Sequence, residues 1–324
     1  MTGVQTCALP ISKELAGSAA LQAQWGLLQD KPAKEPTLHD LRWLGCFQHV
    51  LDVTLAMARL LDGCVRKTGS ASIDERHFRL GIIAALYHDC GYIRHRKDTK
   101  HANGAEYTRI HVSRGARFLE EYMPSVGMAE LAEAAARAIH FTGYEIAVDK
   151  IQVPGPEFRL IGNLLGSADI LAQMADRCYL EKCRDRLYSE FVVGGVAVEH
   201  AKPGEYMVRY ESGTDLLKKT PMFYQQVMRD RLNSKFTRAY RYIEVLYNGQ
   251  NPYIDAIRNN ITHLLAMPAT VACCFIKGTE LEHRELQRLI RLIYPFMKKE
   301  LSLDRKSTRL NSSHSSVSRM PSSA

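Results

Sequence analysis

Apolar residues recur at intervals of three and four positions along most of the chain, which is the period of an amphipathic α-helix. Over residues 41–65 two neighbouring apolar stripes follow this period, and His49 falls within one of them. The pattern therefore predicts a helix that directs the His49 imidazole inward, among apolar side chains.

A second helix is predicted to begin at Asp74, whose side chain can accept a hydrogen bond from the free backbone amides of a first turn. Its apolar run ends on the dipeptide His88-Asp89, and Gly91 follows closely enough to stop the helix. An imidazole and a carboxylate are thus expected at the inner end of a buried helix.

Further helices follow the same period, and the connections between them are short. They are predicted over residues 104–122, 128–141, 157–180, 214–231, 234–247, 253–265 and 280–299. A short strand is predicted over residues 206–210. In the helix 157–180, Gly162 and Gly166 lie on the face that leads to Asp169, which favours close packing of that face. The sequence thus predicts an all-α fold, a helical bundle with an additional C-terminal helical region.

Both ends of the chain have an unusual origin in common. One short DNA string encodes residues 304–314 when read on one strand and residues 1–11 when read on the other, with GTG as the start codon. We therefore expect residues 1–11 and 304–324 to be translated sequencing adapter, and exclude them from fold reasoning. The remainder divides into an N-terminal segment (12–40), a first helical domain (41–191) and a C-terminal helical region (192–303).

Composition narrows the class of protein. No stretch approaches about eighteen consecutive apolar residues, so no membrane-spanning helix is expected. The excluded tail carries four basic residues against one acidic residue, so the net charge falls from +8 to +5 without it. This modest surplus suits an anionic small-molecule substrate but does not indicate a stable nucleic-acid complex. The seven cysteines outside residues 1–11 form no Cys-x-x-Cys pair, which favours a reducing cytoplasm over a disulfide framework or a zinc site.

Imidazole and carboxylate side chains recur about once per predicted helix in the first domain. The candidate metal ligands are His49, His88, Asp89, His111, His140 and Asp169. A single buried histidine is more often a hydrogen-bonded core residue than a ligand, but such positions on successive inward-facing helices favour a metal centre. Imidazole and carboxylate donors without thiolate suit Mn, Fe, Co, Ni, Zn or Mg. Because Asp89 has two carboxylate oxygens, it could bridge two divalent ions.

The order His, His-Asp, His, His, Asp resembles the HD superfamily of metal-dependent phosphohydrolases, and the resemblance covers about residues 41–191. It implies an HD-type helical bundle with two ion positions. The first ion would be held by His49, His88, Asp89 and Asp169, and the second by His111 and His140, with Asp89 bridging.

The segment His111-Val-Ser-Arg-Gly115 is similar to the H-P-x-x-G motif of the two-metal branch, which includes the HD-GYP cyclic dinucleotide phosphodiesterases. Val112 replaces the proline, and the segment 141–145 contains Gly143-Tyr144 but lacks the proline of that branch's Gly-Tyr-Pro and the residues that precede it there. Residues 179–187 and 222–224 are similar to uncharacterised bacterial HD proteins.

A basic segment leaves the helix that ends at His88-Asp89. Its default interpretation is a solvated surface, but its position also allows a phosphate-binding role. The candidates for holding a phosphate are Arg94, Arg96, Lys97 and Arg114. His95 and His101 are candidates for protonating a leaving group, beside Asp89 as the catalytic carboxylate.

Together with these residues, the resemblance implies a metal-dependent phosphohydrolase that hydrolyses a phosphate ester, a nucleotide or another phosphodiester, through a metal-bound hydroxide. A different reaction on the same ligands is an alternative, since a few HD-fold proteins resembling myo-inositol oxygenase hold two irons and activate dioxygen. A non-catalytic nucleotide-sensing HD module is a third interpretation.

Overall fold

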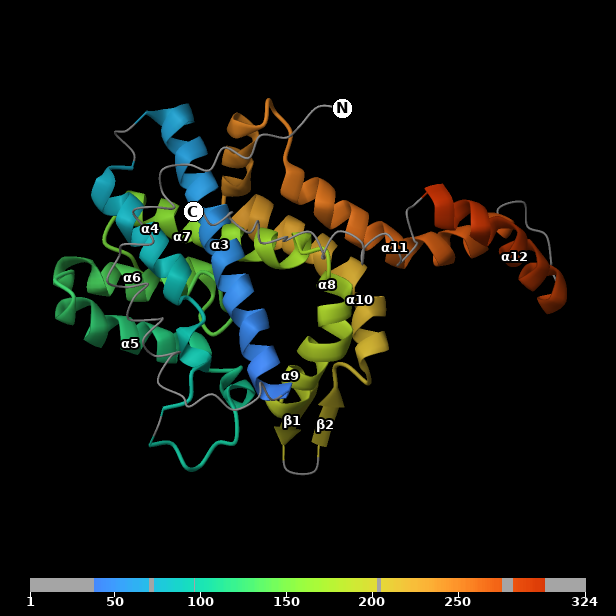
Figure 1. Ribbon diagram of the computed structural model, residues 1–324, viewed down its shortest axis with the longest axis horizontal. Coiled ribbons are helices and arrows are strands. Elements are labelled where there is room, and N and C mark those ends of the chain that lie inside the picture. Colours follow the sequence, from blue (N-terminus) through green and yellow to red (C-terminus); the bar gives the residue numbers. More distant parts are fainter. Residues whose placement is uncertain (1–37, 70–72, 96, 203–204, 276–281, 301–324) are drawn as a thin grey trace, which may run out of the picture.

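The computed structural model describes residues 38–69, 73–95, 97–202, 205–275 and 282–300, and its ribbon is drawn in Figure 1. Nearly all of the regular structure in these residues is helical, which confirms the predicted all-α fold. The two excluded ends and most of the segment 12–40 lie outside the described residues.

The first two predicted helices are present. α3 spans Leu38–Thr68, and α4 spans Glu75–Tyr87. The carboxylate of Asp74 accepts a hydrogen bond from the backbone amide of His77 at 2.9 Å, so Asp74 is the N-cap of α4 as predicted.

α4 ends just before His88-Asp89, as predicted, but Gly91 is not what ends it. Gly91 lies inside a 3-10 turn, η1 (Cys90–Tyr92), and does not have the positive φ of a helix-terminating glycine. A Cβ at Gly91 would lie 1.7 Å from the carbonyl oxygen of His111. The missing side chain therefore permits the close approach of two backbones, and the prediction that Gly91 stops the helix was wrong.

Two predicted helices are broken by short 3-10 turns. The predicted helix 104–122 is divided into η2 (Gly104–Tyr107) and α5 (His111–Ser125), and α5 continues to include Pro124 in its last turn. The predicted helix 128–141 is divided into η3 (Ala129–Leu131) and α6 (Ala132–Ile139). As a result, His111 is the first residue of α5.

The helix α7 (Pro156–Ala175) follows the turn η4 (Val148–Lys150) and lies at the centre of the fold. A Cβ at Gly162 would lie 2.5 Å from the Phe141 ring, and one at Gly166 would lie 2.5 Å from the Phe236 ring. The expected close packing of this face is present, and it brings the following turn, with Asp169, deep into the bundle.

The rest of the chain forms shorter elements and two long helices. These are α8 (Tyr179–Lys182), the π-helical turn η5 (Cys183–Leu187), α9 (Tyr188–Val193), β1 (Val198–Lys202), β2 (Glu205–Val208), α10 (Gly213–Gln226), the π-helical turn η6 (Val227–Lys235), the 3-10 helix η7 (Ala239–Leu246), α11 (Pro252–Cys274) and α12 (His283–Glu300). β1 and β2 pair antiparallel, so the strand predicted at 206–210 is present, with a partner that the sequence pattern did not predict.

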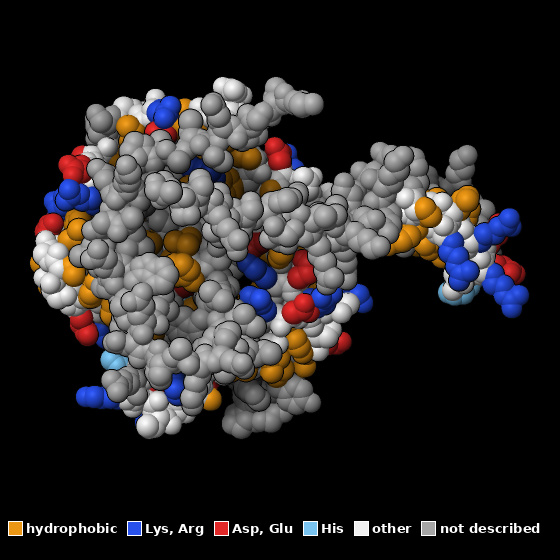
Figure 2. All heavy atoms as spheres, in the orientation of Figure 1, with side chains coloured by type: hydrophobic (Ala, Val, Ile, Leu, Met, Phe, Trp, Pro, Cys, Tyr) orange, Lys and Arg blue, Asp and Glu red, His pale blue; other side chains and the backbone are white. Residues whose placement is uncertain are grey.

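The C-terminal helices share the hydrophobic core of the first domain. η7 packs on α3, and α11 packs on α7. Ile243, Ile257 and Ile261 belong to the same buried cluster as the apolar residues of α3 and α4. α12 extends away from this body, and Figure 2 shows basic side chains on it. Among the described residues, no helix has the length and apolar character needed to cross a membrane.

We expect Gly166→Ala to lower the free energy of unfolding by about 1–3 kcal/mol, because the new methyl group must displace the Phe236 ring and the Phe141 carbonyl. Gly81→Ala is the matched control, since its Cβ would meet only the ends of flexible side chains, Met57 at 2.7 Å and Leu61 at 3.1 Å, and no backbone atom or aromatic ring. Denaturant unfolding of both variants measures the difference. Equal stability of the two variants would contradict the account of α7 packing.

Candidate metal centre

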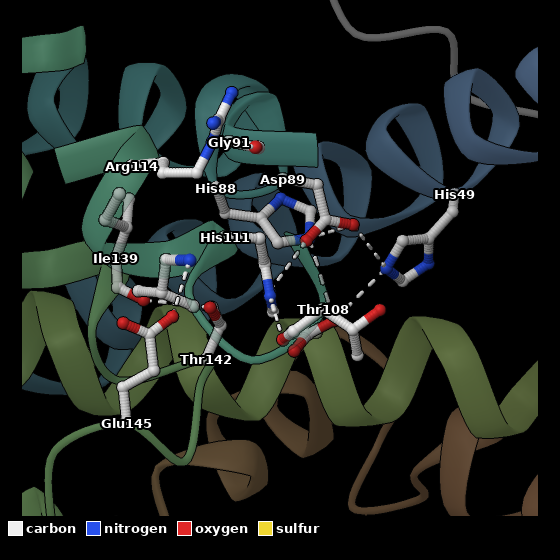
Figure 3. Close-up of polar contacts among 12 residues, drawn as sticks. His49, His88, Asp89, Gly91, Thr108, His111, Arg114, Ile139, Thr142 and Glu145 are labelled. Carbon is white, nitrogen blue, oxygen red and sulfur yellow. Dashed lines mark hydrogen bonds and ion pairs between the residues drawn. The ribbon is translucent and has the colours of Figure 1, made fainter. Parts of the chain in front are cut away.

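Five of the predicted ligands converge at one place inside the bundle, as Figure 3 shows for the labelled histidines and Asp89. His49 comes from α3, His88 and Asp89 follow α4, His111 begins α5, and Asp169 comes from α7. Residues that are distant in the sequence therefore present imidazole and carboxylate groups to one another. This convergence is the condition that a metal centre requires.

The two carboxylates lie between the same two imidazoles. Asp169 Oδ1 is 3.2 Å from His49 Nε2 and 3.8 Å from His88 Nε2. Asp89 Oδ2 is 3.3 Å from His88 Nε2 and 3.8 Å from His49 Nε2. Four side chains thus direct nitrogen or oxygen atoms into one small volume.

Asp89 also faces a second side. Its other oxygen, Oδ1, is 3.7 Å from Nε2 of His111. The two oxygens of one carboxylate therefore point toward different imidazoles, which is the arrangement that a bridging ligand needs.

The tautomers of two histidines follow from their backbone contacts. Nδ1 of His88 lies 2.8 Å from the carbonyl oxygen of Ala85, and Nδ1 of His111 lies 2.8 Å from that of Thr108. A carbonyl oxygen only accepts, so each Nδ1 carries a proton, and in its neutral form each ring presents the lone pair of Nε2 to the cluster. This is the usual way in which a protein orients a histidine ligand.

The donor set fits a cation. Nε2 of His88 is buried and has no hydrogen-bond partner among the described residues. Ligand atoms of His49, His88 and Asp89 lie within 4.8 Å of one another, and this group can hold a metal ion. The side chain of Asp89 remains 23% exposed, whereas that of His88 is 1% exposed, so the cluster is open to solvent on the Asp89 side.

The pKa values of His88 and Asp89 each depend strongly on the charge of the other residues in the cluster. Burial alone would raise the pKa of the Asp89 carboxyl, but the attraction of His88, His49 and His111 outweighs it and holds that pKa well below its usual range. Burial would lower the pKa of His88, but Asp89 and Asp169 outweigh it and raise the pKa of His88 to about 9. In the absence of a metal ion, a proton on His88 thus compensates the buried negative charge.

A second layer of contacts holds His111, and the sequence pattern did not indicate it. The ring of Tyr92 stacks on His111 with centroids 4.1 Å apart. The hydroxyl of Thr108, whose carbonyl orients His111, donates to Glu190 Oε1 at 3.4 Å. Burial raises the pKa of the Glu190 carboxyl. Glu190 comes from α9, and no spacing or motif links it to His111.

His140 is not joined to this cluster by any contact within the described part of the chain. It follows the last residue of α6, is buried, and has an Nδ1 atom without a hydrogen-bond partner among the described residues. Burial lowers the pKa of His140, which favours the neutral imidazole. The structure therefore brings together five of the six predicted ligands.

The basic segment after η1 is organised by an acidic residue. Asp98 accepts from the backbone of Lys100 at 2.9 Å and lies 2.8 Å from Nδ1 of His101. Arg94 donates to the carbonyl oxygen of His101 at 2.7 Å. His95 and Lys97 are exposed, and Arg96 lies outside the described residues.

Arg114 has a structural role. Its guanidinium donates to the carbonyl oxygens of Gly91 at 2.8 Å and Ile93 at 3.0 Å, and its carbon lies 3.3 Å from the Tyr107 ring centroid. Burial lowers the pKa of Arg114. These contacts fasten the backbone that follows Asp89 onto α5.

Two family models match the chain. The Npun_R2479-like model matches residues 96–264, which is just over half of the 324 residues. The chain belongs to the Npun_R2479-like family. The range that this model matches contains His111 and Asp169, and it begins after His88. No solved structure matches the chain.

The second match corrects the predicted function. Residues 218–317 are similar to the glycerol-3-phosphate acyltransferase C-terminal region. This likeness is evidence against an HD phosphohydrolase acting on a phosphate ester, so that prediction was wrong. The coarser prediction of an enzyme agrees with it. None of the five converging residues lies within 218–317, so the match concerns the C-terminal region of this Npun_R2479-like protein.

We expect the affinity of this centre for a divalent cation to rise with pH up to about 9. His88, with its pKa raised to about 9, holds a proton below that pH, and a cation can use Nε2 only after the proton has left. One displaced proton corresponds to about a tenfold gain in affinity per pH unit. Calorimetric titration with Mn²⁺ in two buffers of different protonation enthalpy measures the release, and an affinity independent of pH would contradict the assignment.

Proposed function

We propose that this protein is a metal-dependent enzyme whose centre is built from His49, His88, Asp89 and Asp169. The observation that carries the proposal is the buried Nε2 atom of His88. It has no hydrogen-bond partner among the described residues, although the proton on Nδ1 leaves its lone pair directed at two carboxylates. A lone pair facing carboxylate oxygens is repulsive unless a proton or a cation lies between them.

We propose a second cation position on the other side of Asp89. Asp89 Oδ1 and His111 Nε2 would contribute to it, and Asp89 would bridge the two ions. The likeness of ligand order to the HD superfamily supports this part of the proposal. That likeness concerns the metal donors and does not extend to the reaction.

A divalent cation supplies Lewis acidity, which polarises a coordinated substrate oxygen and stabilises negative charge that develops on it. The residues of the chain position the donors for this purpose. The carbonyl of Ala85 fixes the ring of His88, and that of Thr108 fixes the ring of His111. Since Asp89 keeps part of its surface exposed, a substrate can approach from its side of the cluster.

The decisive variant is His88→Ala. We expect it to weaken binding of the first cation by more than about 100-fold, because loss of even an outer partner of a ligand costs 10–100-fold. Metal-stripped protein, reloaded with Mn²⁺ or Zn²⁺ and passed through a desalting column, is analysed for bound metal. The wild-type chain is expected to retain metal in whole-number stoichiometry.

His283→Ala is the matched control, because His283 lies on α12 and its ring contacts only Gln287 within the described part of the chain. Activity is measured as the turnover of a panel of acyl oxygen esters and thioesters, which the acyltransferase likeness suggests as substrates. Activity is expected in reloaded wild-type and His283→Ala protein and absent from His88→Ala. A His88→Ala protein with the wild-type metal content would contradict the proposal.

A further inference from the structure

The loop after α6 packs against the first turn of α5, where His111 lies. A Cβ at Gly143 would lie 2.6 Å from Cγ2 of Val112, so the absence of a side chain lets the loop approach the helix closely. The approach brings Glu145 to the N-terminus of α5, and Figure 3 shows Glu145 in the same close-up as His111.

Glu145 takes the role of a helix cap from a distant part of the chain. Its Oε1 accepts from the backbone amide of Val112 at 2.8 Å, and its Oε2 accepts from that of Ser113 at 3.1 Å. The hydroxyl of Ser113 also donates to Oε2. The residue that normally provides a cap is Ile110, which has no side chain able to do so.

These contacts supply hydrogen-bond acceptors for the first backbone amides of α5. The first amides of a helix have no acceptor inside the helix, and the helix dipole makes this end partially positive. A carboxylate satisfies the amides and matches the sign of the dipole. Glu145 therefore fixes where α5 begins and how its first turn is oriented.

The first turn of α5 determines the position of the His111 ring. His111 is the first helical residue, directly before Val112, and its Nε2 lies 3.7 Å from Asp89 Oδ1. If the amides at 112 and 113 lost their acceptor, the turn could fray, and Nε2 would move relative to Asp89. His49, His88 and Asp169 come from α3, the end of α4 and α7, and Glu145 has no recorded contact with them in the described part of the chain.

The loop itself is held from the C-terminal region. Arg231 donates to the carbonyl oxygens of Phe141 at 2.6 Å and Gly143 at 3.0 Å. Its guanidinium carbon lies 4.3 Å from the centroid of the Tyr144 ring. Because Arg231 is buried, these bonds are shielded from water, and Glu145 is presented to α5 by a fixed loop.

We propose that Glu145 is a positioning residue for His111, and that it controls the affinity of the second cation position while leaving the first unaffected. The proposal rests on the proposed function, in which His111 and Asp89 contribute to that second position. Glu145 does not contact the cation in this account. It acts through the backbone amides of α5.

The test compares Glu145→Ala, Glu145→Gln and Glu121→Ala. Glutamine keeps the shape of glutamate and one acceptor oxygen, so it can still bond to one of the two amides. Glu121 is exposed on the same helix and serves as the matched control. Metal-stripped protein is titrated with Co²⁺, and the visible absorption of each bound ion is followed. A long-range ¹⁵N–¹H NMR spectrum of the metal-free protein reports the tautomer of the His111 ring.

We expect Glu145→Ala to weaken the second Co²⁺ ion by about 10- to 100-fold and the first by less than about threefold. Glu145→Gln should recover part of this loss, and Glu121→Ala should resemble the wild-type chain. The His111 ring should change from a single Nδ1–H tautomer to a mixture in Glu145→Ala. This NMR measurement needs no metal, so it reports on Glu145 even if Glu145→Ala binds no ion.

Two outcomes would overturn the proposal. In the first, both alterations of Glu145 leave the second ion and the His111 tautomer as in the wild-type chain. In the second, Glu145→Gln weakens both ions equally, which would assign Glu145 to general stability. Wild-type protein that takes up no cobalt would instead contradict the proposed metal centre, and the His111 tautomer in the variants would then decide the positioning role separately.

Discussion

Two carboxylates held within reach of the same two imidazoles impose the main electrostatic constraint on this protein. Asp89 and Asp169 both lie within 4 Å of His49 and His88, in a place where His88 is fully buried. Two carboxylates that share the same two imidazole neighbours repel each other, and in a medium of low dielectric constant this costs free energy unless positive charge accompanies them. A proton on His88, whose pKa is raised to about 9, provides it in the metal-free protein, and a cation would provide it more completely.

The backbone is arranged to bring these charges together. Gly91 allows the turn after Asp89 to lie directly against the carbonyl of His111, and Arg114 fastens the same turn to α5. Gly166 allows α7 to lie against Phe141 and Phe236, one turn before Asp169. Each contact removes freedom from the element that carries a ligand. The bundle therefore limits how far the carboxylates can separate to relieve their repulsion.

Local patterns in the sequence predicted the parts of this arrangement that are local in nature. The apolar period located α3, α4 and α7, and Asp74 marked the start of α4 because a cap is read from a few adjacent residues. The order of histidines and aspartates identified the five residues that converge, together with His140, which makes no contact with them among the described residues. It did not identify the reaction, since the same donors serve many chemistries, and the predicted phosphohydrolase activity was corrected by the likeness of residues 218–317 to an acyltransferase region.

The contacts that support the centre could not be predicted, because they join residues far apart in the sequence. Glu145 caps the start of α5 from 33 residues beyond Val112, whose backbone amide it accepts from. Glu190 reaches Thr108 from α9, and Arg231 reaches the loop after α6 from η6. The spacing of apolar and polar residues along the sequence does not reveal such pairs. The break between η2 and α5, which places His111 at a helix start, was likewise not predicted from the sequence.

The most direct measurement is anomalous diffraction from crystals of the protein soaked in Mn²⁺ or Zn²⁺. The account predicts an anomalous peak about 2.0–2.3 Å from Nε2 of His49 and of His88, with oxygens of Asp89 and Asp169 completing the site. Crystals in which the soaked metal binds elsewhere, and no metal lies within bonding distance of Nε2 of His88, would contradict it.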